Sequence, residues 1–233
     1  MPQRSQVALE PRKSPVQARS AASVDAILDA TIQVLLRVGK ERLTTTRVAL
    51  RAGVSVGTLY QYFPNKSALL QAVLKRHLGE VTETVEAVCE EQRGGTLGQM
   101  VTALINAFLE AKMRDAETSV ALYAVSSDVD GVKIGQQMGV RSNRAIVRML
   151  ESAADPLGRD PQLIASMLQG AMVGVSRRML ESGAAEKQFE GLRRELIAMA
   201  CAYVEACSAR VQVESGSQVV GWNELRTVTK RMP

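Results

Sequence analysis

The segment RVALRAGVSVGTLYQYFPNKSALL, residues 47–70, contains a glycine turn and a proline too close together for one long helix. The threonines before it and the glycine within it are typical of the two ends of a short helix from about Thr45 to Ala52. Ser55 is a favourable cap for a second helix, Val56 to Tyr62, which must end before Pro64 because the α conformation is disfavoured before proline. The segment therefore predicts two short helices joined by a tight turn.

Amphipathic patterns flank this segment on both sides. Apolar residues at three- and four-residue intervals predict a helix from about Ser20 to Val38, with Gly39 as its stop, and Asn65 is suited to cap a long helix after the segment. A support helix followed by two short helices and a glycine turn is the pattern of a helix-turn-helix module. Further amphipathic helices are predicted near residues 99–125, 134–152, 162–181 and 186–209. The predicted fold class is all-α, with an N-terminal three-helix helix-turn-helix domain followed by a helical bundle.

The second short helix has one side free for contacts outside the module. Leu59 and Phe63, four residues apart, supply its inner face, so the remaining residues face outward. Gly57 removes a side chain where the backbone must approach a DNA duplex. Val56 and Thr58 offer methyl groups for contact with thymine. These residues predict that the helix enters a DNA groove.

The other outward residues fit DNA contact in different ways. Gln61 can read an adenine edge, because its amide carries a donor and an acceptor together. Tyr60 and Tyr62 carry hydroxyls suited to phosphate oxygens, and a role as core filler is disfavoured because so small a module already has its apolar filler. Lys66, in the first turn of the next helix, opposes the helix dipole unless an anion such as a DNA phosphate lies nearby. A merely solvated lysine is the alternative.

Basic charge is concentrated in the N-terminal third of the chain. Residues 1–80 contain 12 Lys and Arg against 5 Asp and Glu, whereas the whole chain contains 29 against 24. Such an excess indicates either a polyanionic partner or a solubilising surface, and charge alone does not separate the two. Changes in composition predict a flexible basic arm at residues 1–18, a helix-turn-helix DNA-binding domain at 19–66, a larger helical domain at 67–210 and a tail at 211–233.

The run LTTTRVALRAGVSVGTLYQYFPNKSALLQAVL, residues 43–74, resembles the DNA-binding signature of the TetR/AcrR family of transcriptional regulators. The resemblance rests on the threonine-rich helix entry, the A-G-V-S turn, G-T-L-Y, Y-F and N-K-x-x-L, and it extends over about residues 20–80. It implies an all-α homodimer whose third helices enter successive major grooves of double-stranded DNA at a palindromic operator. It also implies that the domain at 67–210 is regulatory, with ligand-binding and dimerisation roles.

The residues and this resemblance together define the candidate DNA contacts. Gln61 stands where the family often has an aromatic residue, histidine or arginine. The candidates are Thr45, Thr46, Arg47, Ser55, Val56, Gly57, Thr58, Tyr60, Gln61, Tyr62 and Lys66.

Two surfaces are predicted in the second domain. Small residues at four-residue intervals permit close helix packing, either between subunits or within one. The predicted dimer interface comprises Leu163, Ser166, Met167, Gly170 and Gly174. Methionine adapts to irregular voids, although ordinary core is the alternative for each apolar residue of the middle helices. The predicted effector contacts are Met100, Leu104, Phe108, Tyr123, Met138 and Met172, and the expected effector is a small, apolar organic molecule.

Other function classes find little support in the sequence. The chain has one histidine, three cysteines without metal-ligand spacing, no phosphate-binding glycine loop and no nucleophile elbow, so we expect no catalytic residue, metal or cofactor. No apolar run is long enough for a signal peptide or membrane span, so a cytoplasmic protein without membrane contact is expected.

The leading hypothesis is a ligand-responsive transcriptional repressor that the effector releases from its operator, and activators share the same architecture. The alternative is a helical small-molecule-binding or interaction protein without sequence-specific DNA binding.

Overall fold

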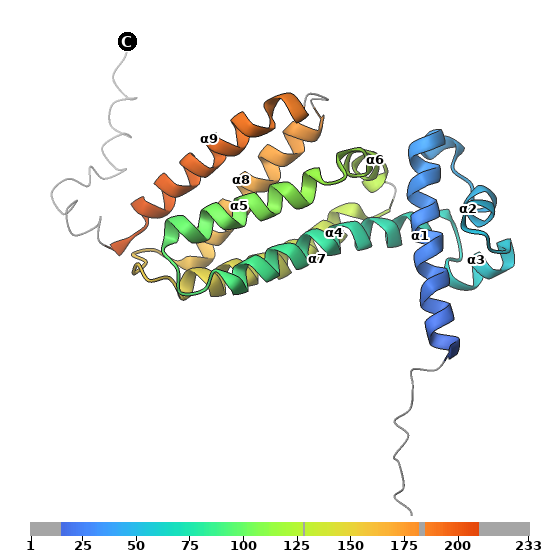
Figure 1. Cartoon of the computed structure of the whole chain (residues 1–233), viewed down its shortest axis with the longest axis horizontal. Helices are drawn as coiled ribbons and strands as arrows, with labels where there is room; N and C mark the ends of the chain where they lie inside the picture. The colour runs from blue at the N-terminus through green and yellow to red at the C-terminus, as the bar shows by residue number, and fades with distance from the viewer. Residues whose placement is uncertain (1–14, 128, 182–184, 210–233) are drawn as a thin grey trace, which may run out of the picture. The chain divides into compact units, whose positions relative to one another are not determined.

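The computed structural model describes residues 15–127, 129–181 and 185–209, and every regular element within these ranges is a helix (Figure 1). The helices are α1 (Pro15–Arg42), α2 (Thr45–Ala52), α3 (Val56–Tyr62), α4 (Lys66–Glu91), α5 (Leu97–Met113), α6 (Ala116–Ser126), α7 (Gly131–Glu151), α8 (Pro161–Glu181) and α9 (Ala185–Ala206). The extended pairing in these ranges is limited to an isolated bridge between Leu157 and Ser208. The predicted all-α class is confirmed.

Helix α1 begins earlier than the sequence predicts. It starts at Pro15 rather than near Ser20, so residues 15–18, assigned to the flexible arm, are helical. Proline is favourable in the first position of a helix, because its missing N–H would have no partner there and its φ angle is already helical. The rest of the predicted arm, residues 1–14, and the predicted tail at 211–233 lie outside the described residues.

The chain divides into two compact units. Within the described residues, the first comprises those up to Arg76 together with Ala121–Val132, and the second comprises His77–Val120 and those from Lys133 onward. The sequence predicts one boundary after residue 66, but α4 continues as a single helix past that point. The observed division also differs from the predicted one because Ala121–Val132, a segment that begins within α6, belongs to the first unit.

In the first unit, α1 packs on α2, and α2 packs on α3 (Figure 1). Ile27 of α1, Val48 of α2 and Leu59 of α3 are fully buried, as is Leu69 of α4. Phe63, at the end of α3, is also buried. The predicted inner face of α3, formed by Leu59 and Phe63, is therefore confirmed.

Local signals set the ends of α2 and α3. The Thr44 hydroxyl accepts a hydrogen bond from the N–H of Arg47 at 3.3 Å, and the Ser55 hydroxyl accepts one from the N–H of Thr58 at 2.9 Å. Gly53 ends α2 in the left-handed conformation, with a φ of 69°. Both helices have the predicted bounds because their capping residues lie next to them in the sequence.

Replacing Gly53 by alanine is expected to lower the free energy of unfolding by about 1–2 kcal/mol, because a residue with a Cβ is strained in the left-handed region. No heavy atom lies within 4 Å of a Cβ built at this position, so backbone strain and not crowding is the cause. Denaturant unfolding followed by circular dichroism measures the change. The control is Gly57→Ala in the helical backbone of α3, and equal losses in both variants would contradict the expectation.

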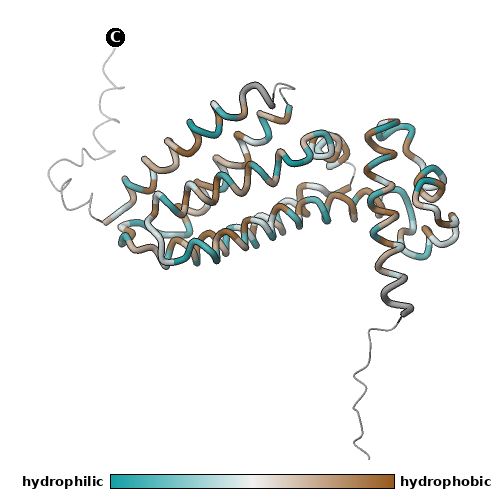
Figure 2. The backbone as a smooth tube through the Cα atoms, viewed as in Figure 1, coloured by the Kyte–Doolittle hydropathy of each residue, from teal (hydrophilic) through white to brown (hydrophobic). Residues whose placement is uncertain are grey.

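Helices α5, α8 and α9 lie side by side in the second unit (Figure 1). Figure 2 shows apolar residues alternating with polar ones along these helices, as expected for helices with one buried side. The core joins α5 residues such as Met100 and Leu104 to residues of α4, α7, α8 and α9. This core positions the exposed face of α8 described below.

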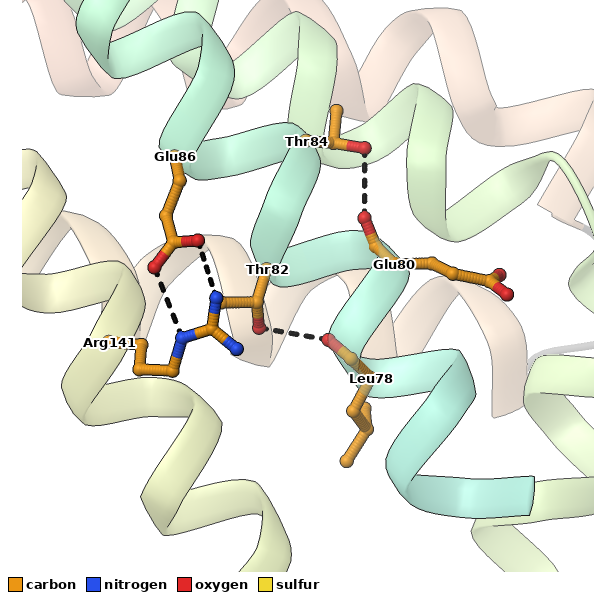
Figure 3. A network of polar contacts seen from close by, with 6 residues as sticks. All are labelled: Leu78, Glu80, Thr82, Thr84, Glu86 and Arg141. Atoms are coloured by element: carbon orange, nitrogen blue, oxygen red, sulfur yellow. Dashed lines mark hydrogen bonds and ion pairs between the residues drawn. The ribbon is translucent and has the colours of Figure 1, made fainter. Parts of the chain in front are cut away.

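A bidentate ion pair connects α4 with α7 (Figure 3). Arg141 donates to the Glu86 carboxylate from Nε at 3.2 Å and from Nη2 at 2.6 Å. The hydroxyls of Thr82 and Thr84 on the same part of α4 bond to backbone carbonyls one turn earlier (Figure 3). Exposed ion pairs add little to stability, so the shared apolar core, and not this pair, holds α7 against α4.

One predicted helix is wrong. Residues 99–125 form parts of two helices, α5 and α6, which are separated at Arg114 and Asp115. The Asp115 carboxylate accepts a hydrogen bond from the N–H of Thr118 at 3.0 Å and so caps a new helix. The sequence has no glycine or proline at this point, so a prediction from apolar periodicity alone gives one long helix in place of two.

Candidate nucleic-acid interface

One side of α3 is open to solvent. Leu59 is 0% exposed, whereas Val56 is 37% exposed and Tyr60 is 48% exposed. Gly57 and Gln61 are exposed as well. The helix is thus anchored on one face and accessible on the other, which is the geometry that a helix entering a DNA groove requires.

Two other predicted contacts on α3 lie deeper. Thr58 and Tyr62 are half-buried, although the sequence places both on the outward side. The Thr58 hydroxyl lies 2.8 Å from that of Ser55, the exposed capping residue of the helix. The Ser55 hydroxyl therefore caps the N-terminus of α3, and the Thr58 hydroxyl is hydrogen-bonded to it.

A hydrogen bond joins the two short helices at the surface. The Tyr60 hydroxyl lies 3.0 Å from Oγ1 of Thr45, which begins α2 and is half-buried. Thr46, beside it, is exposed. The structure thus brings candidate residues of α2 and α3 together, and the Tyr60 ring is not part of the core.

The two basic candidates bond to the C-terminal end of α1. Arg47 is exposed and donates from Nη1 to the carbonyl of Arg42 at 2.8 Å, while half-buried Lys66 donates from Nζ to the carbonyl of Lys40 at 2.5 Å. Cations are favourable at this end of a helix, because unpaired carbonyls leave partial negative charge there. This contact explains the placement of Lys66 without a phosphate, an explanation that sequence reasoning missed.

The candidate dimer residues line an exposed face of α8. Leu163 and Met167 are each 56% exposed, and no heavy atom lies within 4 Å of a Cβ built at Gly170 or Gly174. Ser166 is also exposed, and its hydroxyl donates to the carbonyl of Gln162 at 2.8 Å. Exposed Val173 of α8 and Met199 of α9 extend the apolar surface beyond the predicted set. We call these exposed residues of α8 and α9 the α8–α9 face.

The candidate effector contacts fall into separate environments. Met100, Leu104, Phe108 and Met172 are buried together in the core of the second unit. Met138 is half-buried on α7, and half-buried Tyr123 belongs to the first unit. The structure therefore groups four of the six candidates and does not place the other two among them.

A polar cluster next to this core was not predicted. We define it as His77 of α4, Lys112 of α5, and Thr118 and Ser119 of α6. The Ser119 hydroxyl donates to the Lys112 carbonyl at 3.1 Å and lies 3.0 Å from Nε2 of His77. A signal existed in the sequence, because Lys112 follows Phe108 by four residues and so lies on the buried face of α5.

Burial makes the His77 imidazole a weak base. Desolvation and, next, the positive charge of Lys112 lower its pKa to about 4, partly opposed by Asp115. The unfolded chain takes up this proton near pH 6.5 and the folded chain near 4, so the stability that neutral His77 contributes is present above pH 6.5 and is lost towards pH 4. We expect the stability advantage of the wild type over His77→Asn to shrink over that interval in denaturant unfolding. A constant advantage from pH 7 to pH 4 would contradict this expectation.

The described ranges contain neither a metal-ligand cluster nor a membrane-spanning helix. No group of three or more His, Cys, Asp or Glu residues there is placed to hold a metal ion. No helix there combines the length and apolar character needed to cross a bilayer.

Two family models match this chain. Residues 27–73 match the model for bacterial regulatory proteins of the tetR family, and residues 96–203 match the tetracyclin repressor-like C-terminal domain. The chain belongs to the TetR family. The matched ranges include α2 and α3 in the first unit and α5, α7 and α8 in the second.

Curated relatives match parts of this TetR-family chain. The HTH-type transcriptional repressor KstR of Mycolicibacterium smegmatis is 35% identical over 89 residues, which are 38% of this chain and 43% of that protein. The fatty acid metabolism regulator protein of Bacillus subtilis is 33% identical over 66 residues, 28% of this chain and 34% of that protein. The chain thus spans less than half the length of these two relatives.

Solved structures share the fold over a larger part of the chain. The fatty acid degradation regulator FadR of Bacillus halodurans has a TM-score of 0.59 at 18% identity, covering 80% of this chain and 97% of that one. SmeT, the repressor of the Stenotrophomonas maltophilia multidrug efflux pump SmeDEF, has a TM-score of 0.57 at 23% identity, covering 81% and 91%. At these identities the likeness concerns the fold alone.

Proposed function

We propose that this protein is a ligand-responsive transcriptional repressor that binds a palindromic operator as a homodimer. The observation that carries the proposal is the exposed edge of α3, held in place by buried Leu59. Cytoplasmic location and the absence of a catalytic role are part of the same proposal, since a DNA-binding regulator acts where the chromosome is.

DNA contact is assigned to the accessible residues of α2 and α3. Gly57 lets the backbone approach the base pairs, Val56 offers methyl groups to thymine, and Gln61 offers a donor and an acceptor to adenine. Tyr60 and Thr46 are placed to contact phosphates, because each is exposed and carries a hydroxyl. The Lys66 ammonium has three N–H donors and uses one of them for the carbonyl of Lys40, so a phosphate contact is compatible with that bond.

Dimerisation is assigned to the α8–α9 face. Helices α8 and α9 contact each other, and both carry exposed apolar side chains, such as Met167 and Met199. A twofold axis would pair this face with its own copy, the commonest arrangement among oligomers. The open space around Gly170 and Gly174 allows a second helix to approach the α8 backbone closely.

Effector binding is assigned to the second unit, whose core includes Met100, Leu104, Phe108 and Met172. The names of KstR and SmeT describe repressors, and two regulators of fatty acid metabolism or degradation are among the similar proteins. These names support repression here and an effector with a largely apolar body. Effector binding would favour a dimer in which the spacing of the two α3 helices no longer matches major grooves about 34–36 Å apart.

Gel-shift titration of the full chain against the DNA that flanks its own gene tests this function. We expect a retarded complex that resists excess unrelated DNA and weakens steeply as salt rises, because phosphate contacts release counterions. Equal binding to unrelated DNA, or no binding at low salt, would favour the alternative of a helical interaction protein without sequence-specific DNA binding.

A further inference from the structure

The polar cluster contains a cation within the protein interior. Lys112 is 5% exposed, and it is the one charged side chain in the described ranges that falls among the buried residues. Burial lowers its pKa to about 8, so the amine is still mostly protonated at pH 7. A protonated amine at this depth is unusual in a protein interior, and buried titratable groups with shifted pKa values are candidates for function.

The hydrogen bonds of Ser119 determine the state of His77. The Ser119 hydroxyl has one proton, and the Lys112 carbonyl can only accept, so this proton is directed to the carbonyl. Towards His77 the hydroxyl must then accept, which assigns the proton of the neutral imidazole to Nε2. The histidine is held as a neutral side chain by the low pKa described above, and Lys112 provides the positive charge of the cluster.

Thr118 adds a second observation that points to a ligand. It is 1% exposed, and its hydroxyl is the buried side-chain oxygen in the described ranges that has no hydrogen-bond partner. Leaving a buried hydroxyl without a hydrogen-bond partner lowers stability, and a ligand acceptor would remove that cost. The N–H of Thr118 already bonds to the Asp115 carboxylate, so the hydroxyl is the group of Thr118 that is left to contact a ligand.

We propose that the polar cluster binds the anionic head, a carboxylate or a phosphate, of an effector whose body is apolar. The ammonium of Lys112 would bind the head, and the Thr118 hydroxyl would donate to it. An ammonium has three donors, so Lys112 can accept a ligand alongside its protein contacts. This inference rests on the proposed ligand-responsive function and adds a charged end to the effector.

The surroundings of Lys112 fit such an amphiphile. Phe108 and Leu104 precede it by four and eight residues and are buried on the same face of α5. An apolar chain attached to a head at Lys112 would extend along these residues. Asp115 is exposed and caps the N–H of Thr118, so its carboxylate lies nearer the surface than the buried ammonium.

Calorimetric titration of the full chain with decanoate, decyl phosphate and 1-decanol tests the proposal. We expect at least one of the two anions to bind at least about tenfold more tightly than the alcohol, and the tighter anion identifies the head group. Lys112→Met should remove this preference, with a loss of about tenfold or more for the anion and little change for the alcohol. Thr118→Val should weaken the anion about threefold or more, and it also tests the site if Lys112→Met does not fold.

The matched control is Lys75→Met, which removes the same charge from an exposed position of α4. Its anion affinity should equal that of the wild type. The proposal is overturned if decanol binds as tightly as both anions, if no probe binds, or if Lys112→Met keeps the preference, which would leave Lys112 a purely structural cation. Operator binding is measured separately on the same samples. Operator binding without probe binding overturns the anion site and leaves DNA regulation standing, whereas probe binding without operator binding supports the anion site and counts against regulation.

Discussion

Gly57→Ala should reduce operator affinity by about 10- to 100-fold, because the added methyl group would lie where the α3 backbone approaches the base pairs. The free protein has room for it: a Cβ built at Gly57 would lie 3.7 Å from Oγ of Ser55, an ordinary van der Waals distance. Alanine also favours helix over glycine by up to about 1 kcal/mol, so the fold should be stabilised. Fluorescence anisotropy with labelled operator and thermal unfolding together measure both effects.

A glycine at the same helix position in the second unit provides the control. Gly98 is the second residue of α5, as Gly57 is of α3, and nothing lies within 4 Å of a Cβ built there. Gly98→Ala should likewise favour helix but leave operator affinity unchanged. If both variants bind the operator as tightly as the wild type, Gly57 is not at a close approach to DNA.

Met167→Glu should convert the dimer into monomers and weaken binding to a full palindrome by about a hundredfold or more. A carboxylate on the α8–α9 face would be buried without a partner on association, and a monomer loses the gain from binding two half-sites together. Sedimentation measures the oligomeric state, and anisotropy measures affinity for full and half operators. Affinity for the half operator should change little.

Val140 offers a comparable site outside the proposed interface. It is an apolar side chain of α7 with 51% exposure, close to the 56% of Met167. Val140→Glu should remain dimeric and bind the palindrome as the wild type does. A monomeric wild type, or a Met167→Glu protein that stays dimeric, would contradict the assignment of the dimer to this face.

The sequence predicted the short helices of the first unit well because the residues that begin and end them lie next to them in the chain. Thr44 and Ser55 cap the helices that follow them, and Gly53 takes the left-handed conformation that ends α2. A helix and its capping residues are close in sequence, so predicting where the helix begins and ends needs no knowledge of the rest of the fold. The burial of Leu59 followed for the same reason, since only one side of so short a helix can face the other helices.

Interactions between distant residues were not predictable from spacing alone. Lys66 bonds to the carbonyl of Lys40, 26 positions earlier, and only the folded chain brings the two together. The polar cluster likewise joins His77 to Ser119, which are 42 positions apart. The break before α6 had a local signal in Asp115, but the apolar pattern that continues past it is stronger than a single capping residue.

Chemical protection of guanine N7, which lies in the major groove, tests the central claim that the exposed edge of α3 enters DNA. On its operator the wild-type chain should protect guanines in two major-groove segments about one helical turn apart, and Gly57→Ala should lose this protection first as protein is diluted. Tight, sequence-selective binding that leaves guanine N7 fully reactive in both segments would contradict the account.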